Sequence, residues 1–486
     1  MNVNNPSITD SELVIGLVGA IGTDLDRVIE IIKPRLVAFG YDVFTTRISK
    51  DVIQECFQIK KFDSKYQSKR ELMDAGNQMR RDSGDNSILA MGAASNINFL
   101  RDTNSDSSKP KAYIINSLKH PKEIEGLKEI YGQGYFTIGV FADEDKRRES
   151  LTRNNEMQTE QANELIAIDM DEHLKHGQST RDTFQLSDFF VHLTSDDDCL
   201  INDIHRFLDL MFGNPFITPT FDEYAMFMAF SSSLKSADLA RQVGAVIAKS
   251  DTIVGTGAND TPKFGGGQYW PHVINKKIDD DENGRDWKRG FDSNNKEKNR
   301  IIDEIVNQLP PKVKSDVKDI LNDSSISDIT EYGRSVHAEM DALLSCARNG
   351  INTTNATLYC TTFPCHNCAK HIISAGIVQV VYVEPYPKSK APSFHNDSIR
   401  VGIEQQNDKV LFKPFIGVGP RRFFDLFSIN LGFGYRIKRK DGNGDCVKWT
   451  VKDAALRTQL RRLDYIKLEI LSSQVFNNYL EKTQNE

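Results

Sequence analysis

The sequence predicts an α/β protein with two domains and a C-terminal helical extension. Short apolar runs alternate with amphipathic helical patterns, and a turn-rich segment separates two such alternations. A length of 486 residues suits about two to four domains, and 39% hydrophobic residues permit sizeable cores. The formal net charge of −7 argues against a protein built mainly to coat nucleic acid.

The first alternation occupies residues 1–213. Residues 12–18 form an apolar run that ends in glycines and predicts a buried strand. A helical pattern follows, in which Pro34 is expected to kink the helix or end it early. Further strands are predicted at 42–48, 111–118 and 135–141. Strands that alternate with helices at this spacing indicate a parallel sheet.

The second alternation occupies residues 221–430. The predicted helices are 221–235, 336–348 and 365–375, and the predicted strands are 244–249, 252–257, 356–363 and 378–384. Residues 264–334 interrupt this pattern with charge runs, glycines and prolines, which predict a solvated insertion with a helical piece near 299–309. Residues 431–486 end in a helical pattern that carries Leu456, Leu460, Leu463 and Ile470, and we expect a packing or assembly role for it.

Three residues of the second alternation have the spacing of metal ligands. Cys365 and Cys368 lie three apart at the start of a predicted helix, so both thiolates can face one point, and His337 opens the preceding helix. Three protein ligands leave the fourth tetrahedral position to water, as in catalytic zinc sites. Glu339 would not bind the metal and would carry the proton of the activated water.

The combined pattern is more specific than either half. His337-Ala338-Glu339 followed by Pro364-Cys365-His366-Asn367-Cys368 is the signature of zinc-dependent nucleobase deaminases. The alternative is a closed structural zinc knuckle with His366 or His371 as fourth ligand, which would leave Glu339 without a task. We therefore favour a catalytic zinc.

The other cysteines indicate the compartment. The chain has seven, and only one pair stands at metal spacing. The first residues lack the basic and apolar regions of a signal peptide, and no apolar run reaches the roughly 18 residues of a membrane helix. We expect a cytoplasmic protein with no membrane segment and no disulfide framework.

With these residues in view, 221–430 resembles the deoxycytidylate deaminase family. The resemblance extends over the leading helix, Arg241–Ile247, Gly257–Pro262 and Leu358–Cys368. It implies a sheet flanked by helices and the hydrolysis of a cytosine nucleotide to the uracil nucleotide and ammonia, with Glu339 protonating N3 and then the leaving amine. It also implies a sugar contact for Asn259, whose alternative role is turn geometry, and substrate contacts for Ala338, Phe363 and Pro364.

The whole chain resembles the bacterial anti-phage deoxycytidine nucleotide deaminases, which join a P-loop-kinase-like N-terminal domain to a deaminase. The segments that carry this resemblance are Gly16–Gly22, 384–390 and Gly417–Arg422. It implies deamination of dCTP and dCMP, depletion of the cytosine deoxynucleotide pool during infection, repression by a small non-coding RNA, and a homo-oligomer.

The N-terminal domain departs from a working P-loop. Gly16, Gly19, Gly22 and Thr23 are its candidate nucleotide-binding residues, but Thr23 and Asp24 follow Gly22 where a Walker A loop needs lysine. Nucleotide binding through backbone N–H groups at the helix start stays open, whereas phosphoryl transfer is not expected. We interpret residues 1–213 as a regulatory domain.

Two other functions stay open. A polynucleotide deaminase acting on tRNA or single-stranded DNA would need a basic channel and contacts to flanking bases, of which the net charge gives no sign. A sensor with a vestigial deaminase would bind nucleotide or RNA without releasing ammonia. The intact set of His337, Glu339, Cys365 and Cys368 favours an enzyme that acts on free nucleotides.

Overall fold

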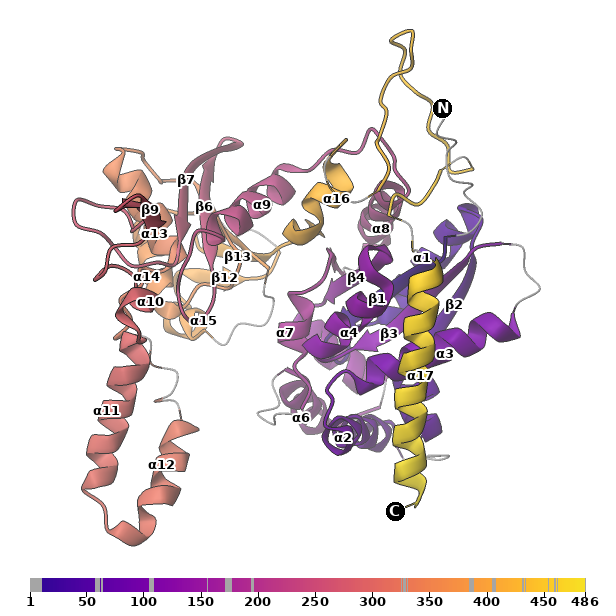
Figure 1. Ribbon diagram of the computed structural model, residues 1–486, viewed down its shortest axis with the longest axis horizontal. Helices are drawn as coiled ribbons and strands as arrows, with labels where there is room; N and C mark the ends of the chain where they lie inside the picture. Colours follow the sequence, from indigo (N-terminus) through magenta and orange to yellow (C-terminus); the bar gives the residue numbers. More distant parts are fainter. Residues whose placement is uncertain are drawn as a thin grey trace. The chain divides into compact units, whose positions relative to one another are not determined.

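The computed structural model describes residues 11–485, apart from 57–61, 63, 105–108, 155, 171–176, 194–195, 325, 327–328, 330, 384–388, 404–407, 431, 433, 453, 459 and 461. Its contacts divide the chain into two compact units. The first unit runs to Glu223 and resumes at Phe415, and the second runs from Tyr224 to Val383 and continues to Pro414 (Figure 1). The second unit is therefore inserted into the sequence of the first.

A six-stranded sheet of order β14-β5-β4-β1-β3-β2 forms the centre of the first unit. Its strands are β1 (Leu13–Gly19), β2 (Asp42–Arg47), β3 (Lys111–Leu118), β4 (Tyr135–Phe141), β5 (Phe189–His192) and β14 (Gly417–Val418). Strands β1 to β5 run parallel, as predicted, and β14 pairs antiparallel with β5. Every residue of β1 is buried because helices cover both faces of a parallel sheet.

Helices complete the first unit around this sheet. On one face, α1 (Leu25–Ala38) and α8 (Asp197–Met211) share a core with alternate residues of β1 and β4. Helices α3 (Ile88–Thr103) and α4 (Pro121–Tyr131) pack together and against β3 and β4. The remaining helices of this part are α2 (Lys65–Ser83), α5 (Glu144–Glu149), α6 (Thr159–Met170) and α7 (Thr180–Phe184).

Helix α1 continues through Pro34 to Ala38, so of the two predicted outcomes the early end is wrong and the kink stays a prediction. Proline inside a helix removes one hydrogen bond and costs ~3 kcal/mol or more. Ile32 and Leu36 on either side are fully buried, and the N–H of Phe39 bonds to the Arg35 carbonyl beyond the proline. Apolar burial on both sides of Pro34 offsets the lost bond.

The chain after Pro414 packs into the first unit. Val418, Leu426, Ala454 and Leu456 join its core, so the contacts group residues 415–430 with the N-terminal sheet rather than with the residues from 221 onward. Helix α16 (Phe423–Phe427) lies in this segment. Before the last helix the chain is not helical, although Leu456 and Leu460 are buried there. The predicted helical pattern through these two leucines is therefore wrong.

Helix α17 (Arg462–Asn485) packs against α3 (Figure 1). Arg101 of α3 connects the two ends of the unit's sequence. Its guanidinium donates to Glu12 at 2.7 Å and to Glu469 of α17 at 2.9 Å. This partly buried ion-pair group fixes the C-terminal helix to the N-terminal sheet.

The second unit has its own six-stranded sheet, of order β12-β13-β11-β10-β6-β7. The strands are β6 (Gly244–Lys249), β7 (Thr252–Ala258), β10 (Thr357–Cys360), β11 (Gln379–Tyr382), β12 (Ile399–Val401) and β13 (Val410–Pro414). β10 to β13 run parallel, whereas β6 pairs antiparallel with β10 and β7. Both units are mixed α/β structures, as predicted.

Helices α9 (Phe221–Ser233), α13 (Ala338–Arg348), α14 (His366–Ser374) and α15 (Ala391–Phe394) accompany this sheet. Two glycines permit close helix–strand packing. A Cβ at Gly257 of β7 would lie 2.2 Å from the Ala338 carbonyl oxygen, and one at Gly244 of β6 would lie 1.9 Å from the Ala229 carbonyl oxygen. Helix α13 can therefore place its N-terminus directly over the sheet.

The predicted insertion has structure of its own. It contains β8 (His272–Ile274), β9 (Lys277–Asp279), α10 (Asp286–Arg289), α11 (Ser293–Asn307) and α12 (Lys314–Asn322). β8 and β9 form an antiparallel hairpin, and α11 and α12 pack against each other. The helix expected near 299–309 is thus the second half of α11.

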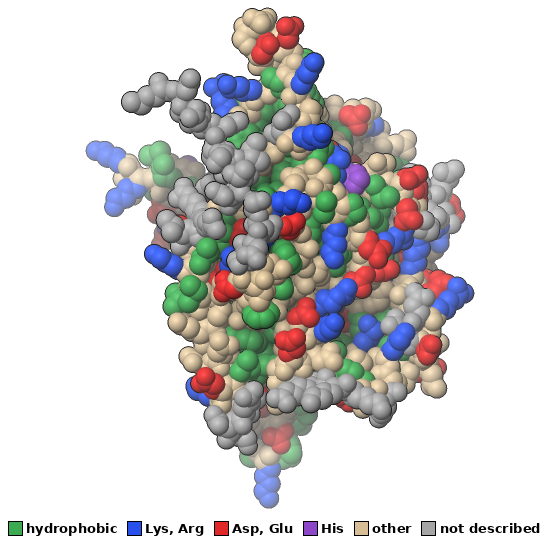
Figure 2. Space-filling model, turned by 90° about the vertical axis from the view of Figure 1, so that its right-hand side faces the viewer, with side chains coloured by type: hydrophobic (Ala, Val, Ile, Leu, Met, Phe, Trp, Pro, Cys, Tyr) green, Lys and Arg blue, Asp and Glu red, His purple; other side chains and the backbone are tan. Residues whose placement is uncertain are grey.

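No helix in the described part of the chain is long and apolar enough to cross a membrane. On the face that Figure 2 shows, Lys and Arg side chains are interspersed with Asp and Glu. Positive and negative charges are therefore mixed on that face, and no large patch of one sign is visible there.

Candidate active site and metal centre

The three predicted metal ligands lie at the starts of two helices. His337 immediately precedes α13, and Cys365 immediately precedes α14, where its sulfur accepts a hydrogen bond from the Cys368 N–H at 3.4 Å. Helix N-termini carry partial positive charge, which stabilises thiolates. The helix–strand–helix order of the sequence therefore brings all three side chains together.

The separations of these atoms fit zinc. Nδ1 of His337 lies 3.4 Å from the sulfur of Cys365 and 3.4 Å from that of Cys368. All three atoms lie within 4.8 Å of one another. A tetrahedral ion with Zn–N of about 2.0 Å and Zn–S of about 2.3 Å places such ligands roughly 3.5 Å apart. One imidazole and two thiolates also form a donor set typical of Zn²⁺.

The two thiols differ in acidity. A hydrogen bond from Cys368 lowers the pKa of Cys365 to about 3. The same interaction raises the pKa of Cys368 well above its usual value. One sulfur of the pair is therefore a thiolate at neutral pH, which is the form that binds a metal ion.

Glu339 lies beside these ligands in the first turn of α13. Its side chain is 4% exposed, and burial raises its pKa. It lines a cavity of about 190 Å³ together with His337 and Cys365 and is not one of the clustered ligands. A buried carboxyl group whose pKa is shifted towards neutrality suits proton transfer.

Three of the four predicted substrate residues line this cavity: Asn259, Ala338 and Phe363. Pro364 is buried but does not line it. Asn259 also holds the cavity wall, because its Oδ1 accepts from the Val243 N–H at 2.6 Å and its Nδ2 donates to the Arg241 carbonyl at 2.7 Å. One N–H of its amide is left over for a ligand.

The cavity includes polar residues that the sequence analysis did not single out. Arg241 lines it and is exposed. Arg334 and Asp286, both from the insertion, line it and form an ion pair of 2.6 Å. Arg241 lies inside the segment that resembles the deaminases, so the resemblance could have identified it as a candidate residue of the cavity. Nothing in the sequence linked Arg334 and Asp286 to the zinc motif.

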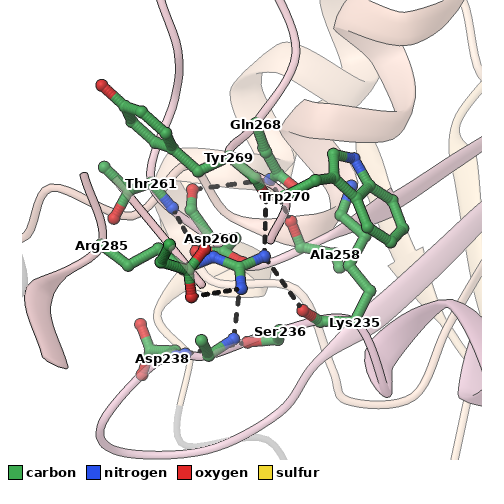
Figure 3. Close-up of polar contacts among 12 residues, drawn as sticks. Lys235, Ser236, Asp238, Ala258, Asp260, Thr261, Gln268, Tyr269, Trp270 and Arg285 are labelled. Atoms are coloured by element: carbon green, nitrogen blue, oxygen red, sulfur yellow. Dashed lines mark hydrogen bonds and ion pairs between the residues drawn. The ribbon is translucent and has the colours of Figure 1, made fainter. Parts of the chain in front are cut away.

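A buried arginine fixes the insertion next to this cavity (Figure 3). The guanidinium of Arg285 lies 3.0 Å from Asp260 and 3.4 Å from Asp280, and it donates to the Tyr269 carbonyl at 2.7 Å. The backbone of Asp260 bonds to that of Val336 at 2.9 Å, one residue before His337. The insertion thus braces the segment that carries the metal ligand.

The histidines of the alternative zinc knuckle have other partners. Nδ1 of His371 lies 2.7 Å from the Asn367 carbonyl oxygen, and Nε2 of His366 lies 3.8 Å from Glu331. Within the described residues, the metal-ligand cluster contains His337, Cys365 and Cys368 and neither of these histidines.

The candidate nucleotide-binding residues of the first unit do not all line the same cavity. Gly19, Gly22 and Thr23 line a second cavity. Gly16 lies inside β1, where a Cβ would lie 2.3 Å from the Tyr135 hydroxyl oxygen. Of the segment 384–390 that carried part of the whole-chain resemblance, residues 384–388 lie outside the described residues.

Comparison with known proteins concerns the second unit. The family model of the cytidine and deoxycytidylate deaminase zinc-binding region matches residues 219–384. Deoxycytidylate deaminase of phage T2 is 33% identical over 184 residues, which are 37% of this chain and 88% of the relative. Deoxycytidylate deaminase of phage T4 is 34% identical over 184 residues, which are 37% of this chain and 86% of the relative.

The chain belongs to the deoxycytidylate deaminase family. The family match contains all three candidate metal ligands and Glu339. Among solved structures, the dCMP deaminase of cyanophage S-TIM5 is 18% identical to this chain. The match covers 40% of this chain and 99% of the phage protein, with a TM-score of 0.23. The same enzyme has also been solved in complex with dCMP and dUMP.

Proposed function

We propose that the second unit is a zinc-dependent deaminase that hydrolyses dCMP to dUMP and ammonia. The observation that carries the proposal is the cluster of His337, Cys365 and Cys368, two of which line one cavity together with the buried carboxyl of Glu339. The phage relatives that this chain resembles are deoxycytidylate deaminases, which supports dCMP as the substrate.

Each side chain has a task in this reaction. His337, Cys365 and Cys368 would hold the zinc, which when bound lowers the pKa of a water molecule towards about 7. Glu339 would take the proton that this water gives up. As the water oxygen bonds to C4 of the cytosine ring, Glu339 would pass this proton to N3. It would then take the second proton of that oxygen and give it to the amino nitrogen, so that the C4–N bond breaks and ammonia leaves. Burial keeps bulk water away from the carboxyl, so the proton passes to the substrate.

The walls of the cavity would orient the nucleotide. Asn259 retains one N–H that can bond to the sugar, while its other contacts keep it in place. Arg241, exposed at the same cavity, is a cation suited to a 5′-phosphate. The ion pair between Arg334 and Asp286 would hold the insertion at the cavity wall.

The proposal has a finer form that rests on the whole-chain resemblance. In this form the enzyme also converts dCTP to dUTP and depletes the cytosine deoxynucleotide pool of infected cells, as an oligomer restrained by a small RNA. The first unit would be the regulatory part. Nucleotide pools measured after phage infection, with and without the gene, test this form separately from the chemistry.

The direct test is ammonia release and product identification with purified protein whose zinc content is known. The substrates are dCMP, dCTP, deoxycytidine and a cytosine oligonucleotide. We expect dUMP from dCMP, with about one zinc per chain. Turnover of the oligonucleotide alone would reassign the protein to polynucleotide editing, and zinc-loaded protein without any turnover would favour a sensor.

A further inference from the structure

Residues 435–452, which we call the basic ribbon, lie between α16 and α17 in the first unit. Lys440 pairs antiparallel with Cys446, and the N–H of Val447 donates to the Arg439 carbonyl at 3.1 Å. Two segments of the chain therefore run side by side and meet at a short tip. In Figure 1 this tip projects from the first unit as a gold loop.

One face of the basic ribbon is anchored to the core of the first unit. Ile437 is buried, and Trp449 and Val451 pack against the apolar cluster of the N-terminal sheet and its helices. The indole N–H of Trp449 donates to the Phe212 carbonyl at 3.2 Å. This anchoring fixes the orientation of the ribbon and leaves its opposite face to solvent.

The opposite face of the ribbon is cationic. Exposed residues alternate with the apolar ones, and the cations among them are Arg436, Lys438, Lys440, Lys448 and Lys452. In an extended segment, alternate side chains point to the same side and stand about 6.6 Å apart along the chain. Within the described part of the chain, the structure records no ion pair or hydrogen bond for any of these five side chains. Their charges are available to an external anion.

Two of these cations oppose each other across the ribbon. Arg439 and Val447 are directly bonded, so the residues next to them, Lys438 and Lys448, are neighbours on the cationic face. Like charges in such positions destabilise a pair of strands. An anion bound over this face would remove the repulsion, which is a physical reason to expect a ligand there.

The acidic residues of the ribbon lie at its tip. The carboxylate of Asp441 accepts from the N–H of Asn443 at 2.8 Å and from that of Asp445 at 3.0 Å, so it holds the turn. Residues 435–452 contain six Lys and Arg against two Asp, a formal charge of +4 in a chain whose total is −7. A local excess of this kind is typical of surfaces that bind polyanions.

We propose that the basic ribbon binds duplex DNA, with the ribbon in the major groove and its cations on the phosphates that border the groove. The major groove of B-form DNA is about 12 Å wide and admits a two-stranded ribbon. The corresponding groove of A-form RNA is too deep and narrow for side chains to enter. Contacts to phosphates carry no base information, so this binding is independent of sequence.

The side chains of the ribbon disfavour two other anionic partners. Single-stranded nucleic acids bind through exposed aromatic side chains on which the bases stack, whereas Tyr435 and Trp449 are partly buried. Peripheral membrane binding uses apolar side chains that enter the lipid, and residues 435–452 expose no aliphatic or aromatic side chain. A duplex is the polyanion that a purely cationic face fits.

The test is fluorescence anisotropy of the full, zinc-loaded chain at several salt concentrations. The probes are a short labelled DNA duplex of mixed sequence, the RNA duplex of the same sequence and one DNA single strand. We expect the DNA duplex to bind most tightly. Lys438→Gln combined with Lys448→Gln should weaken that binding by about tenfold or more. It should also reduce the slope of log K against log salt by about 2, because each phosphate contact contributes about 0.9.

The matched control is Lys467→Gln combined with Lys482→Gln, which makes the same charge change at exposed positions of α17. This control should bind DNA like the parent protein. Thermal denaturation of the Lys438 and Lys448 variant should give a midpoint no lower than that of the parent, because the substitutions remove a repulsion. Unchanged DNA binding by that variant would overturn the proposal. So would equal or tighter binding of the RNA duplex or the single strand, or binding to phosphatidylserine vesicles without binding to DNA.

Discussion

Glu339 and Cys365 lie at one cavity, and the proposed function gives them different tasks that substitutions should separate. Glu339→Gln keeps the size of a buried side chain and removes its acid–base function. We expect full zinc content and a kcat for dCMP lowered roughly 100- to 10,000-fold. Cys365→Ala removes a metal ligand and should lose zinc and activity together. Metal analysis beside ammonia release checks both, and near-normal turnover by zinc-loaded Glu339→Gln would contradict the assigned role.

Arg241 should distinguish a nucleotide from a nucleoside. Its position at the cavity predicts that Arg241→Gln raises KM for dCMP by about tenfold, the scale of a charged hydrogen bond, and leaves kcat/KM for deoxycytidine unchanged. Steady-state kinetics with both substrates measure this. Lys370→Gln, an exposed charge change on α14, is the matched control. Equal losses on both substrates would mean that Arg241 shapes the cavity wall instead.

The cluster of His337, Cys365 and Cys368 could be predicted from the sequence because its pattern is local. Cys365 and Cys368 are one helical turn apart, and His337 and Glu339 are two residues apart, so a short pattern contains the candidate ligands and the proposed proton carrier. Arg334 and Asp286 could not be assigned in this way. They reach the cavity only because a folded insertion places them there, and no local pattern encodes that position.

Among the elements, the insertion should depend on Arg285. Arg285→Gln would leave Asp260 and Asp280 as buried carboxylates without their cation, which typically costs about 3–5 kcal/mol. We expect a lower thermal midpoint and weaker zinc retention, because Asp260 bonds to the segment before His337. Arg289→Gln, an exposed change four residues away, is the control. Calorimetry and zinc release with a chromogenic chelator measure both effects.

Strands and helices with strong patterns were predicted well, and the failures have physical causes. The helix through Pro34 persists because buried neighbours on both sides outweigh a local penalty. Leu456 and Leu460 have helical spacing yet lie in a non-helical segment packed against the first unit. The pairing of β14 with β5 joins Val418 to Phe189, and such a distant partner leaves no mark in the local sequence.

At the scale of the whole molecule, metal removal should act on one unit. A ligand that binds the native state stabilises the structure that contains its site. All three metal ligands lie in the second unit, so chelation of zinc should lower the melting of that unit and leave the melting of the first unit in place. Differential scanning calorimetry with and without chelator, and of Cys365→Ala, measures this. A uniform shift of the entire unfolding profile would contradict it.

The order of the chain also bears on synthesis at the ribosome. Domains commonly fold in the order in which they are made. Here the strand β14 and the helix α17 emerge only after the entire deaminase unit has been translated. Until then the nascent first unit presents an unpaired edge at β5 and an uncovered α3. The catalytic unit therefore has its full sequence before the N-terminal unit does, and a chain cut short after Pro414 would retain the deaminase sequence while lacking the pieces that complete the first sheet.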